Sequence, residues 1–336
     1  MNWKRNSIAL LAALLLPLSP ALGLAQSPAN KPVVAKVILD TDIGDDIDDV
    51  FALSLVLTSP ELHLLGITSA WGDTALRSRM LDRILCETGR DDIPVYTGIA
   101  TKAGAKFSQQ PWASQGIEHA HGDAVTFLLD QIRKNPGEIT LIAIAPLTNI
   151  GAAIDRDPAT FRKLKRVVLM GGSVHRGYDD LGYAAPRGPS AEYNIAMDIP
   201  ASKKLFTSGV PIFMMPLDST QLKFDEVKRS LLTTISTPLT DSLQVLTAEW
   251  QRATQQITPT MFDAVAAAYA VNPQVCPTTP LHIEVDDKGF TRIKPGAPNV
   301  EACLEPHTDA FFEFAMPRLL DQKLIGSKVC TVPAEK

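Results

Sequence analysis

The chain has 336 residues, of which 45% are hydrophobic and 21% are charged. These fractions are typical of a globular protein and exclude a disordered, fibrous or coiled-coil chain. The formal net charge is −5, from 32 basic and 37 acidic residues, and basic residues do not cluster beyond the first few positions. The composition therefore argues against nucleic acid as a partner.

The first 25 residues have the layout of a secretory signal peptide. Lys4 and Arg5 form a positively charged start, residues 8–16 are an unbroken apolar run, and small residues precede a cleavage site after Ala25. The run is too short to span a bilayer, and no later apolar stretch reaches spanning length. We therefore expect an exported protein, periplasmic or secreted, in which residues 26–336 form a single soluble domain without membrane contact. A retained anchor is the alternative.

Short β-branched apolar runs alternate with amphipathic stretches along the rest of the chain. The runs expected to form buried strands are residues 33–39, 62–68, 139–145, 167–170 and 211–215. The stretches expected to form helices are residues 49–57, 76–87, 124–133, 149–155 and 201–207. This alternation predicts an α/β fold with an open, mainly parallel, Rossmann-like sheet flanked by helices. Ligands of such sheets bind beyond the carboxyl ends of the strands, and the Gly-, Pro- and Tyr-rich residues 176–190 form a predicted loop that covers such a site.

The four cysteines have no CxxC spacing, which argues against a zinc or thioredoxin-type site. Cys276 and Cys303 flank a predicted β-hairpin, whose strands are residues 282–285 and 290–293. Because strands that return on themselves bring their flanks together, this pair is a candidate disulfide in an oxidising compartment. Buried free thiols are the alternative, since sequence alone does not fix connectivity.

The most informative segment is residues 40–49, DTDIGDDIDD, in which six of ten residues are acidic and none is basic. It follows the first expected strand and precedes an apolar helix. Burying so many carboxylates is costly unless a cation or protons neutralise them, and Asp48 and Asp49 also favour the positive end of the helix. The segment indicates a functional carboxylate cluster. An acidic capped turn on the surface is the alternative.

Two other acidic motifs begin in a similar way. Twelve residues counted from Asp40 end on Phe51, and from Asp42 on Leu53, so the terminal Glu of an EF-hand is absent. A D-x-D phosphatase of the haloacid dehalogenase type also starts after a strand. That motif would need a small or hydroxyl residue soon after the second Asp, which is missing, and a later Lys paired with acidic residues, which is not evident. The phosphatase is kept as an alternative from a different reaction class.

Residues 37–53 contain VILDTDxG followed by DDxxAL, which resembles the opening signature of the inosine–uridine-preferring nucleoside hydrolases. Further similar blocks follow in the family's order: PELxLLGIT (60–68), PLTNI (146–150), VVLMGG (167–172), AEYNI (191–195) and FDA (262–264). One such block would be a weak signal, but six in order cover most of the chain. The resemblance implies the family's open α/β sheet.

The resemblance also implies a reaction, the Ca²⁺-dependent hydrolysis of the N-glycosidic bond of ribonucleosides to ribose and a nucleobase. In the family, the ion holds two ring hydroxyls and a water, which a carboxylate activates. Carboxylates around the ribose stabilise the oxocarbenium-like transition state. Oxygen ligands suit Ca²⁺, and the lack of nearby His or Cys disfavours zinc. The partner is then a small-molecule nucleoside, and a homo-oligomer is left open. A non-catalytic, Ca²⁺-dependent ribose- or nucleoside-binding protein is the main alternative.

Carried over residue by residue, the resemblance assigns the metal site and the base. The family usually has three residues between the second Asp and the Asp-Asp pair, whereas five intervene here, so the acidic segment is the least regular match. Asp48 matches the water-activating base, and Asp46 is a rival for base or ligand. Asp40 is expected to orient its neighbours from behind the site. The implied metal ligands are Asp42, Asp46 as the rival, Asp49, the backbone carbonyl of Ile144, and Asp263.

The substrate contacts follow from the same resemblance. Glu192 and Asn194 match residues that hold the sugar hydroxyls, and Met170 matches an apolar contact to the ribose. Asp73 stands where the family usually has Asn after a Gly. The alternatives are a surface ion pair for Glu192 and an ordinary core position for Met170.

One departure concerns the leaving group. Phe262 precedes Asp263 where purine-handling members carry a His that protonates the departing base, and Phe cannot donate a proton. Three histidines in predicted loops are candidate acids: His119, His121 and His175. Pro186 stands where the family has an Asn.

Overall fold

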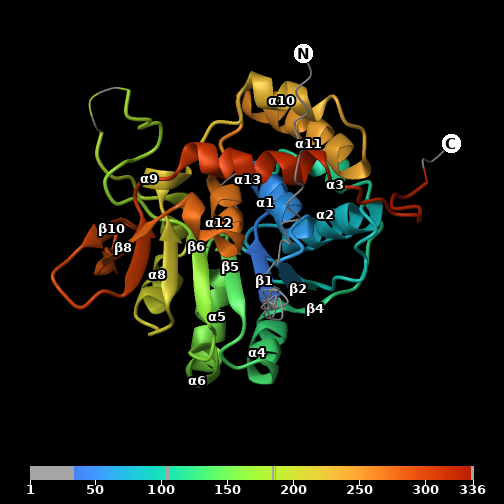
Figure 1. Ribbon diagram of the computed structural model, residues 1–336. Coiled ribbons are helices and arrows are strands. Elements are labelled where there is room, and N and C mark those ends of the chain that lie inside the picture. Colours follow the sequence, from blue (N-terminus) through green and yellow to red (C-terminus); the bar gives the residue numbers. More distant parts are fainter. Residues whose placement is uncertain (1–33, 103–105, 184, 186, 334–336) are drawn as a thin grey trace, which may run out of the picture. The chain divides into compact units, whose positions relative to one another are not determined.

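The computed structural model describes residues 34–102, 106–183, 185 and 187–333 (Figure 1). The expected signal peptide and Pro186 lie outside the described residues. Each of the five predicted strands and five predicted helices is present, with ends that differ from the prediction by at most two residues. The predicted fold class, an open and mainly parallel α/β sheet flanked by helices, is confirmed.

Nine strands form the central sheet in the order β4-β3-β2-β1-β5-β6-β7-β11-β8. All neighbouring pairs are parallel except β11 and β8, which are antiparallel. The strands are β1 (Ala35–Thr41), β2 (Leu62–Ser69), β3 (Val95–Thr97), β4 (Gly122–Asp123), β5 (Thr140–Ile144), β6 (Arg166–Met170), β7 (Ile212–Met215), β8 (Thr278–Leu281) and β11 (Val300–Cys303). The four strands that were not predicted, β3, β4, β8 and β11, have two to four residues each, too few for a clear hydrophobic pattern.

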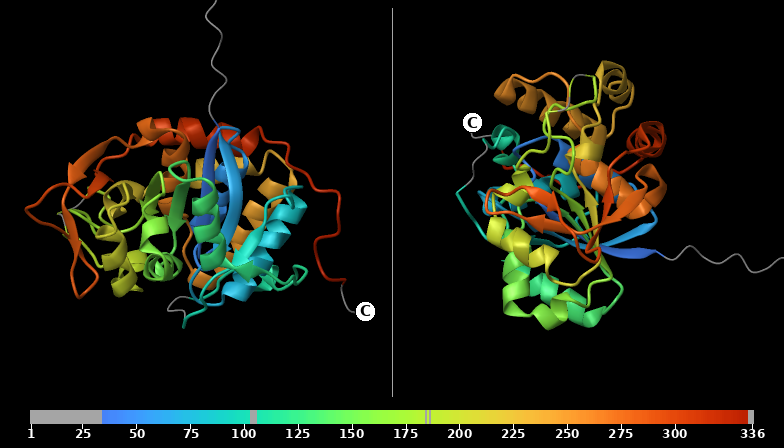
Figure 2. Two further views of the ribbon diagram at one scale, coloured as in Figure 1. Left: turned by 90° about the horizontal axis from the view of Figure 1, so that it is seen from below. Right: turned by 90° about the vertical axis from the view of Figure 1, so that its left-hand side faces the viewer.

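Most of the helices lie in two layers, one on each face of the sheet (Figure 2). Side chains alternate across a strand, so Val37 and Leu39 of β1 belong to one hydrophobic core and Ile38 to the other. The first face carries α1 (Asp48–Leu57), α2 (Thr74–Glu87), α11 (Pro238–Thr254), α12 (Phe262–Val271) and α13 (Thr308–Leu320). The second face carries α4 (Ala124–Lys134), α5 (Thr148–Arg156), α6 (Pro158–Phe161) and α8 (Ile199–Phe206). The remaining short helices are α3 (Gln110–Ala113), α7 (Tyr193–Ala196), α9 (Leu217–Thr220), α10 (Glu226–Leu232) and η1 (Pro273–Val275).

The order of the strands places a crevice beside β1. The chain passes from β1 to β2 on one side, whereas β5 pairs with β1 on the other side. Ligands of open α/β sheets bind at such a switch point, beyond the carboxyl ends of the strands. Helices α1 and α12, whose sequences are almost entirely apolar and buried, pack against one another here and begin near the same edge of the sheet.

The predicted hairpin and its disulfide are present. Strands β9 (Ile283–Val285) and β10 (Thr291–Ile293) pair antiparallel, and Cys276 is bonded to Cys303 with a Cα–Cα distance of 5.6 Å. A second disulfide, Cys86–Cys330, was not predicted because 244 residues separate its cysteines. It links α2 to the C-terminal segment. Within the described part of the chain, no helix combines the length and the apolar character needed to cross a membrane.

Candidate active site

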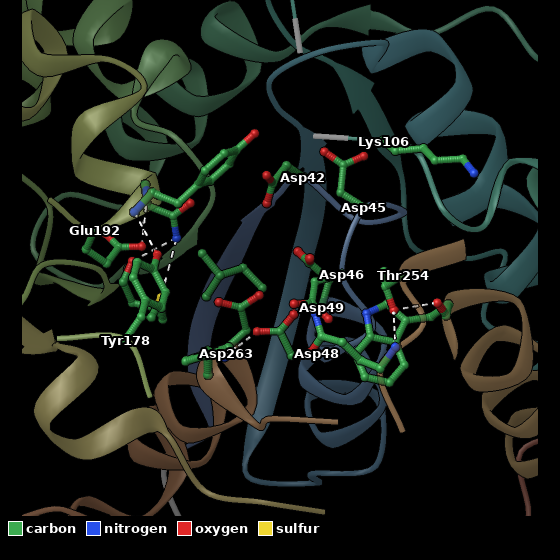
Figure 3. A pocket seen from close by; sticks show the side chains of 17 residues that line it. Asp42, Asp45, Asp46, Asp48, Asp49, Lys106, Tyr178, Glu192, Thr254 and Asp263 are labelled. Carbon is green, nitrogen blue, oxygen red and sulfur yellow. Dashed lines mark hydrogen bonds between the residues drawn. The ribbon is translucent and has the colours of Figure 1, made fainter. Parts of the chain in front are cut away.

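A cavity of about 320 Å³ opens at the switch point of the sheet (Figure 3). Asp42, Ile144 and Met170 line it from the carboxyl ends of β1, β5 and β6. Its other walls come from α1, α7, α11, α12 and the long loop after β6. The cavity therefore stands where the fold class predicts a ligand site.

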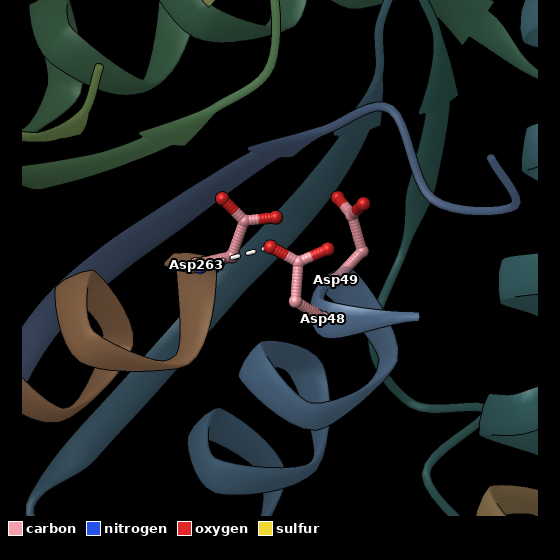
Figure 4. Close-up of side chains that lie close together, drawn as sticks. All are labelled: Asp48, Asp49 and Asp263. Atoms are coloured by element: carbon pink, nitrogen blue, oxygen red, sulfur yellow. Dashed lines mark hydrogen bonds between the residues drawn. The ribbon is translucent and has the colours of Figure 1, made fainter. Parts of the chain in front are cut away.

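Three buried carboxylates converge at the bottom of this cavity (Figure 4). Asp48 and Asp49 lie in the first turn of α1 and Asp263 lies in the first turn of α12. One ligand oxygen from each can be chosen so that all lie within 4.8 Å of one another. The backbone N–H of Asp263 donates to Oδ2 of Asp48 at 3.2 Å, which joins the two helix starts. The positive ends of both helices face the cluster and stabilise its negative charge.

The carboxylates strongly influence one another. Burial raises the pKa of Asp48, Asp49 and Asp263 well above the ordinary value, and the negative charges of their neighbours raise it further. The pKa of Asp42 is raised by burial and then by Asp49, and that of Asp46 is raised by burial. A divalent cation would favour the charged forms of all five, because an opposite charge lowers a carboxyl pKa. An all-oxygen donor set of this kind fits Ca²⁺ or Mg²⁺.

We call Asp42, Asp48, Asp49 and Asp263 the carboxylate side of the cavity.

The buried guanidinium group of Arg77 stabilises the backbone next to the carboxylate side. Arg77 of α2, which is 0% exposed, donates from Nη1 to the carbonyl oxygens of Asp42 and Ile43, the latter at 2.8 Å. Its Nη2 pairs with Asp45 at 2.9 Å. Asp45 therefore serves to neutralise Arg77, which gives one of the extra acidic residues a structural role. Arg77 was not predicted as a site residue, because in the sequence it resembles any other basic residue of an amphipathic helix.

The turn of the acidic segment depends on Gly44. Its φ is +120°, and a Cβ at this position would lie 2.2 Å from the ring of Phe107. The segment after Phe107 also holds the turn, since Nε2 of Gln109 donates to the carbonyl oxygen of Asp46 at 2.6 Å.

Asp40 lies behind the cavity and is not among the residues that line it. Its Oδ1 accepts hydrogen bonds from Thr68 and, at 2.8 Å, from Nδ2 of Asn149. Burial raises the pKa of Asp40 to about 6, although these two hydrogen bonds oppose the rise.

The predicted sugar-binding residues Glu192, Asn194 and Met170 all line the cavity. Glu192 caps α7 and is 2% exposed, so it is not a surface ion pair. Its carboxylate accepts the backbone N–H groups of Gly172 at 2.8 Å and of Asn194 at 2.9 Å. Burial raises the pKa of Glu192 to about 7 against the effect of these bonds. Nδ2 of Asn194 donates to the carbonyl oxygen of Met170 at 3.1 Å.

Asp73 is the one predicted substrate contact that the structure does not bring to the cavity. It is exposed and caps α2, where its carboxylate accepts the backbone N–H of Leu76 at 3.0 Å. This helix-capping role accounts for a carboxylate at that position.

The histidines that were candidate acids also lie elsewhere. None of the six histidines of the chain is among the residues that line the cavity. Nε2 of His121 contacts Asp82 at 2.9 Å, while His119 and His175 are exposed. Phe262, in contrast, lines the cavity.

Three aromatic side chains also line the cavity, and we call them the aromatic side: Tyr178, Trp250 and Phe262. Phe262 was singled out from the sequence, whereas Tyr178 and Trp250 were not. The rings of Tyr178 and Phe262 meet edge to face, with centroids 6.3 Å apart. Oη of Tyr178 accepts the backbone N–H of Tyr193 at 3.0 Å. The Tyr content of residues 176–190 was a weak signal for Tyr178, but nothing local distinguished Trp250 near the end of α11.

Solved structures share this fold. A plant nucleoside hydrolase, the PpNRh1 enzyme, superposes with a TM-score of 0.75 at 24% identity, covering 86% of this chain and 100% of that one. A purine-preferring ribonucleoside hydrolase from Gardnerella vaginalis gives a TM-score of 0.72 at 24% identity, over 84% and 98% of the two chains. At this level of identity the likeness concerns the fold alone.

Sequence relatives extend the comparison. The chain is 35% identical to an uncharacterized protein of Schizosaccharomyces pombe over 58% of its own length and 64% of the relative's. It is 33% identical to the pyrimidine-specific ribonucleoside hydrolase RihB of Escherichia coli O157:H7 over 55% and 60% of the two chains. The chain thus matches just under two thirds of these relatives. The RihB of another Escherichia coli strain is matched at 30% identity over 75% of this chain and 83% of the relative.

The family model described as "Inosine-uridine preferring nucleoside hydrolase" matches residues 37–313. Fold, relatives and family model agree on one class of protein, the nucleoside hydrolases. The chain belongs to the inosine-uridine preferring nucleoside hydrolase family, which confirms the resemblance in the sequence. This membership excludes the D-x-D phosphatase.

Proposed function

We propose that the protein hydrolyses the N-glycosidic bond of ribonucleosides with one bound Ca²⁺, releasing ribose and a nucleobase. The observation that carries this proposal is the set of buried carboxylates at the bottom of the switch-point cavity. Burying them is costly unless a cation is bound, and the cavity beside them has room for a small ligand. The named activity of the Escherichia coli relatives, pyrimidine-specific ribonucleoside hydrolysis, supports the same reaction class.

The residues that would hold the ion are Asp42, Asp49, Asp263 and the carbonyl oxygen of Ile144, with Asp46 as a further candidate. All of them line the cavity and offer oxygen atoms, as Ca²⁺ requires. A bound divalent ion supplies positive charge that acidifies a coordinated water and keeps the surrounding carboxylates ionised.

Asp48 is the proposed general base. It lies in the first turn of α1, and its Oδ2 accepts the N–H of Asp263 in the first turn of α12. Asp48 takes one proton from the attacking water, whose oxygen bonds to the anomeric carbon. The bond between the anomeric carbon and the nitrogen of the nucleobase breaks, and its electron pair goes to the nucleobase. The remaining carboxylates stabilise the positive charge that develops on the ribose.

Glu192, Asn194 and Met170 are the proposed ribose contacts. Glu192 and Asn194 offer a carboxylate and an amide for sugar hydroxyls, and hydrogen bonds to the backbone already hold both side chains in place. Such fixed partners limit the entropy lost on binding. Asp73 is not included, because it lies outside the cavity lining.

The proposed location is the periplasm or the exterior of the cell, with residues 1–25 removed as a signal peptide and residues 26–336 retained as one catalytic domain. The bonded state of all four cysteines supports an oxidising compartment.

Ribose release from a panel of nucleosides tests the proposal. The protein is stripped with a chelator and assayed with and without added Ca²⁺, and release is expected only with the ion. Asp263→Asn should abolish it, whereas Asp155→Asn, a matched change at an exposed ion pair with Lys204, should not. A protein that binds nucleosides with Ca²⁺ but produces no ribose would establish the binding-protein alternative.

A further inference from the structure

We infer that the preferred substrates are ribonucleosides whose base already carries a positive charge, such as N-alkylated purine or pyridinium ribosides. This inference rests on the proposed hydrolytic function and concerns the leaving group that the same cavity accepts. Three features carry it: the absence of a suitable acid, the aromatic side, and the excess of carboxylates.

The first feature is the lack of an imidazole near the leaving group. All six histidines belong to the described residues, and none lines the cavity. The internal residues outside the described ranges, 103–105, 184 and 186, are Ala, Gly or Pro and have no ionisable side chain. Phe262 therefore has no histidine substitute in the cavity.

Other lining residues that carry protons are poorly suited to transfer one to a base. The oxygens of Glu192 already accept backbone N–H groups. Burial, with Glu192 nearby, raises the pKa of Tyr178, and burial also raises that of Tyr193. Both phenols are therefore weaker acids than an exposed tyrosine and give up their protons less readily. Lys106 is exposed, and its side chain extends away from the carboxylate side in Figure 3.

The second feature is the aromatic side itself. Tyr178 and Phe262 meet edge to face, and Trp250 is 1% exposed and lines the same cavity. Aromatic faces attract cations through the ring quadrupole, and the attraction increases when the cation is desolvated. A flat cationic heterocycle in this cavity would meet aromatic side chains that favour its charge.

The third feature is the balance of charge. Seven of the residues that line the cavity carry a carboxylate and one, Lys106, carries an amine. Arg77 and a bound divalent ion would neutralise only part of this charge. A cleft with an excess of one sign attracts ligands of the other sign.

A cationic base removes the need for an acid. When the C1′–N bond of such a nucleoside breaks, the electron pair neutralises the ring, and the base leaves as an uncharged molecule. Water supplies the hydroxyl on C1′, and its remaining proton goes to Asp48 and then to solvent. A neutral purine nucleoside would instead release an anion unless a proton were supplied.

The test compares two substrates of nearly the same shape, 7-methylguanosine and guanosine, at a pH at which the methylated ring is cationic. We expect kcat/KM for 7-methylguanosine to be higher by ~10²-fold or more, the scale of a general acid's contribution. KM for 7-methylguanosine should rise with salt concentration, whereas KM for guanosine should not.

Two variants sharpen the test. Phe262→His should raise kcat/KM for guanosine much more than for 7-methylguanosine, and thus reduce the ratio. Phe262→Leu, which adds no acid, should leave the ratio high even where overall activity falls. Nitrophenyl riboside, whose leaving group needs no proton, is the control substrate.

The two levels of the proposal fail in different ways. If neither nitrophenyl riboside nor any nucleoside yields ribose, the proposed function itself is wrong. If ribose is released but guanosine and 7-methylguanosine are cleaved equally fast, an acid assists guanosine, and the inference about cationic bases is wrong while the hydrolytic function stands.

Discussion

The carboxylate side and the aromatic side of the cavity share α12, which carries both Asp263 and Phe262, but their other members come from different structural parts. Asp48, Asp49 and Asp263 stand in the first turns of two buried helices, and Asp42 directly follows the central strand β1. Tyr178, by contrast, comes from a long loop, and Trp250 comes from the last part of α11. The groups that would hold the ion are therefore fixed by the core. On the aromatic side, Phe262 shares α12 with Asp263 and Trp250 is buried in the same core, so Tyr178 is the member that lies on a loop able to change without altering the sheet.

The largest effect is expected from breaking the carboxylate side. Asp263→Ala removes one ligand from a site that needs several, so activity should be lost and Ca²⁺ should bind far more weakly. Calorimetric titration of the purified variant measures this affinity. In the metal-free protein the same change should increase thermal stability, because it removes one of several buried like charges. An unchanged Ca²⁺ affinity would exclude Asp263 as a ligand.

Asp48→Asn should reduce catalysis without removing the ion. The amide keeps the shape of the side chain but cannot accept the proton of water, so kcat should fall by ~10²-fold or more. Substrate affinity and Ca²⁺ affinity should change little, which equilibrium binding of an uncleaved nucleoside can measure. Near-normal turnover would move the role of base to Asp46, which also lines the cavity.

The charge of the carboxylate side also predicts an unusual pH dependence. Burial raises the folded-state pKa of Asp48, Asp49 and Asp263, and also those of Asp40 to about 6 and Glu192 to about 7. The folded state then binds more protons than the unfolded state, so the stability of the metal-free protein should fall as the pH rises from the ordinary carboxyl range through these values.

Saturating Ca²⁺ should remove most of this slope, since the ion favours the ionised carboxylates in the folded state. Melting temperatures measured across this pH range with chelator and with Ca²⁺ provide the comparison. A chelated protein whose melting temperature rises steadily over the same range would contradict the raised pKa values.

The same contrast explains which parts of the site the sequence could predict. The acidic segment is contiguous and lies at a strand-to-helix junction, so its residues alone placed several carboxylates in one crevice. Asp73 was predicted as a contact, but its side chain caps α2, a local interaction that a motif does not reveal. Trp250 and the Cys86–Cys330 bond depend on how distant segments pack, with 244 residues between the cysteines. No local pattern encodes such packing.

The smallest effect is expected at the hydroxyl of Tyr178. Tyr178→Phe keeps the ring that packs against Phe262 and removes only the O–H, whose oxygen accepts the N–H of Tyr193 in an exposed hydrogen bond. Water can replace that partner, so the free energy of unfolding should change by less than about 1 kcal/mol.

If the ring and not the proton matters, kcat/KM should stay within ~3-fold of the parent protein for both guanosine and 7-methylguanosine, because a hydrogen bond to water substitutes for the lost one. Tyr178→Ala, which removes the ring as well, should reduce kcat/KM more for the cationic substrate, since it removes a cation–π partner. Steady-state kinetics of both variants with both substrates decide the matter. A loss in Tyr178→Phe confined to guanosine would identify Tyr178 as the acid and would make the aromatic side part of the proton-transfer machinery.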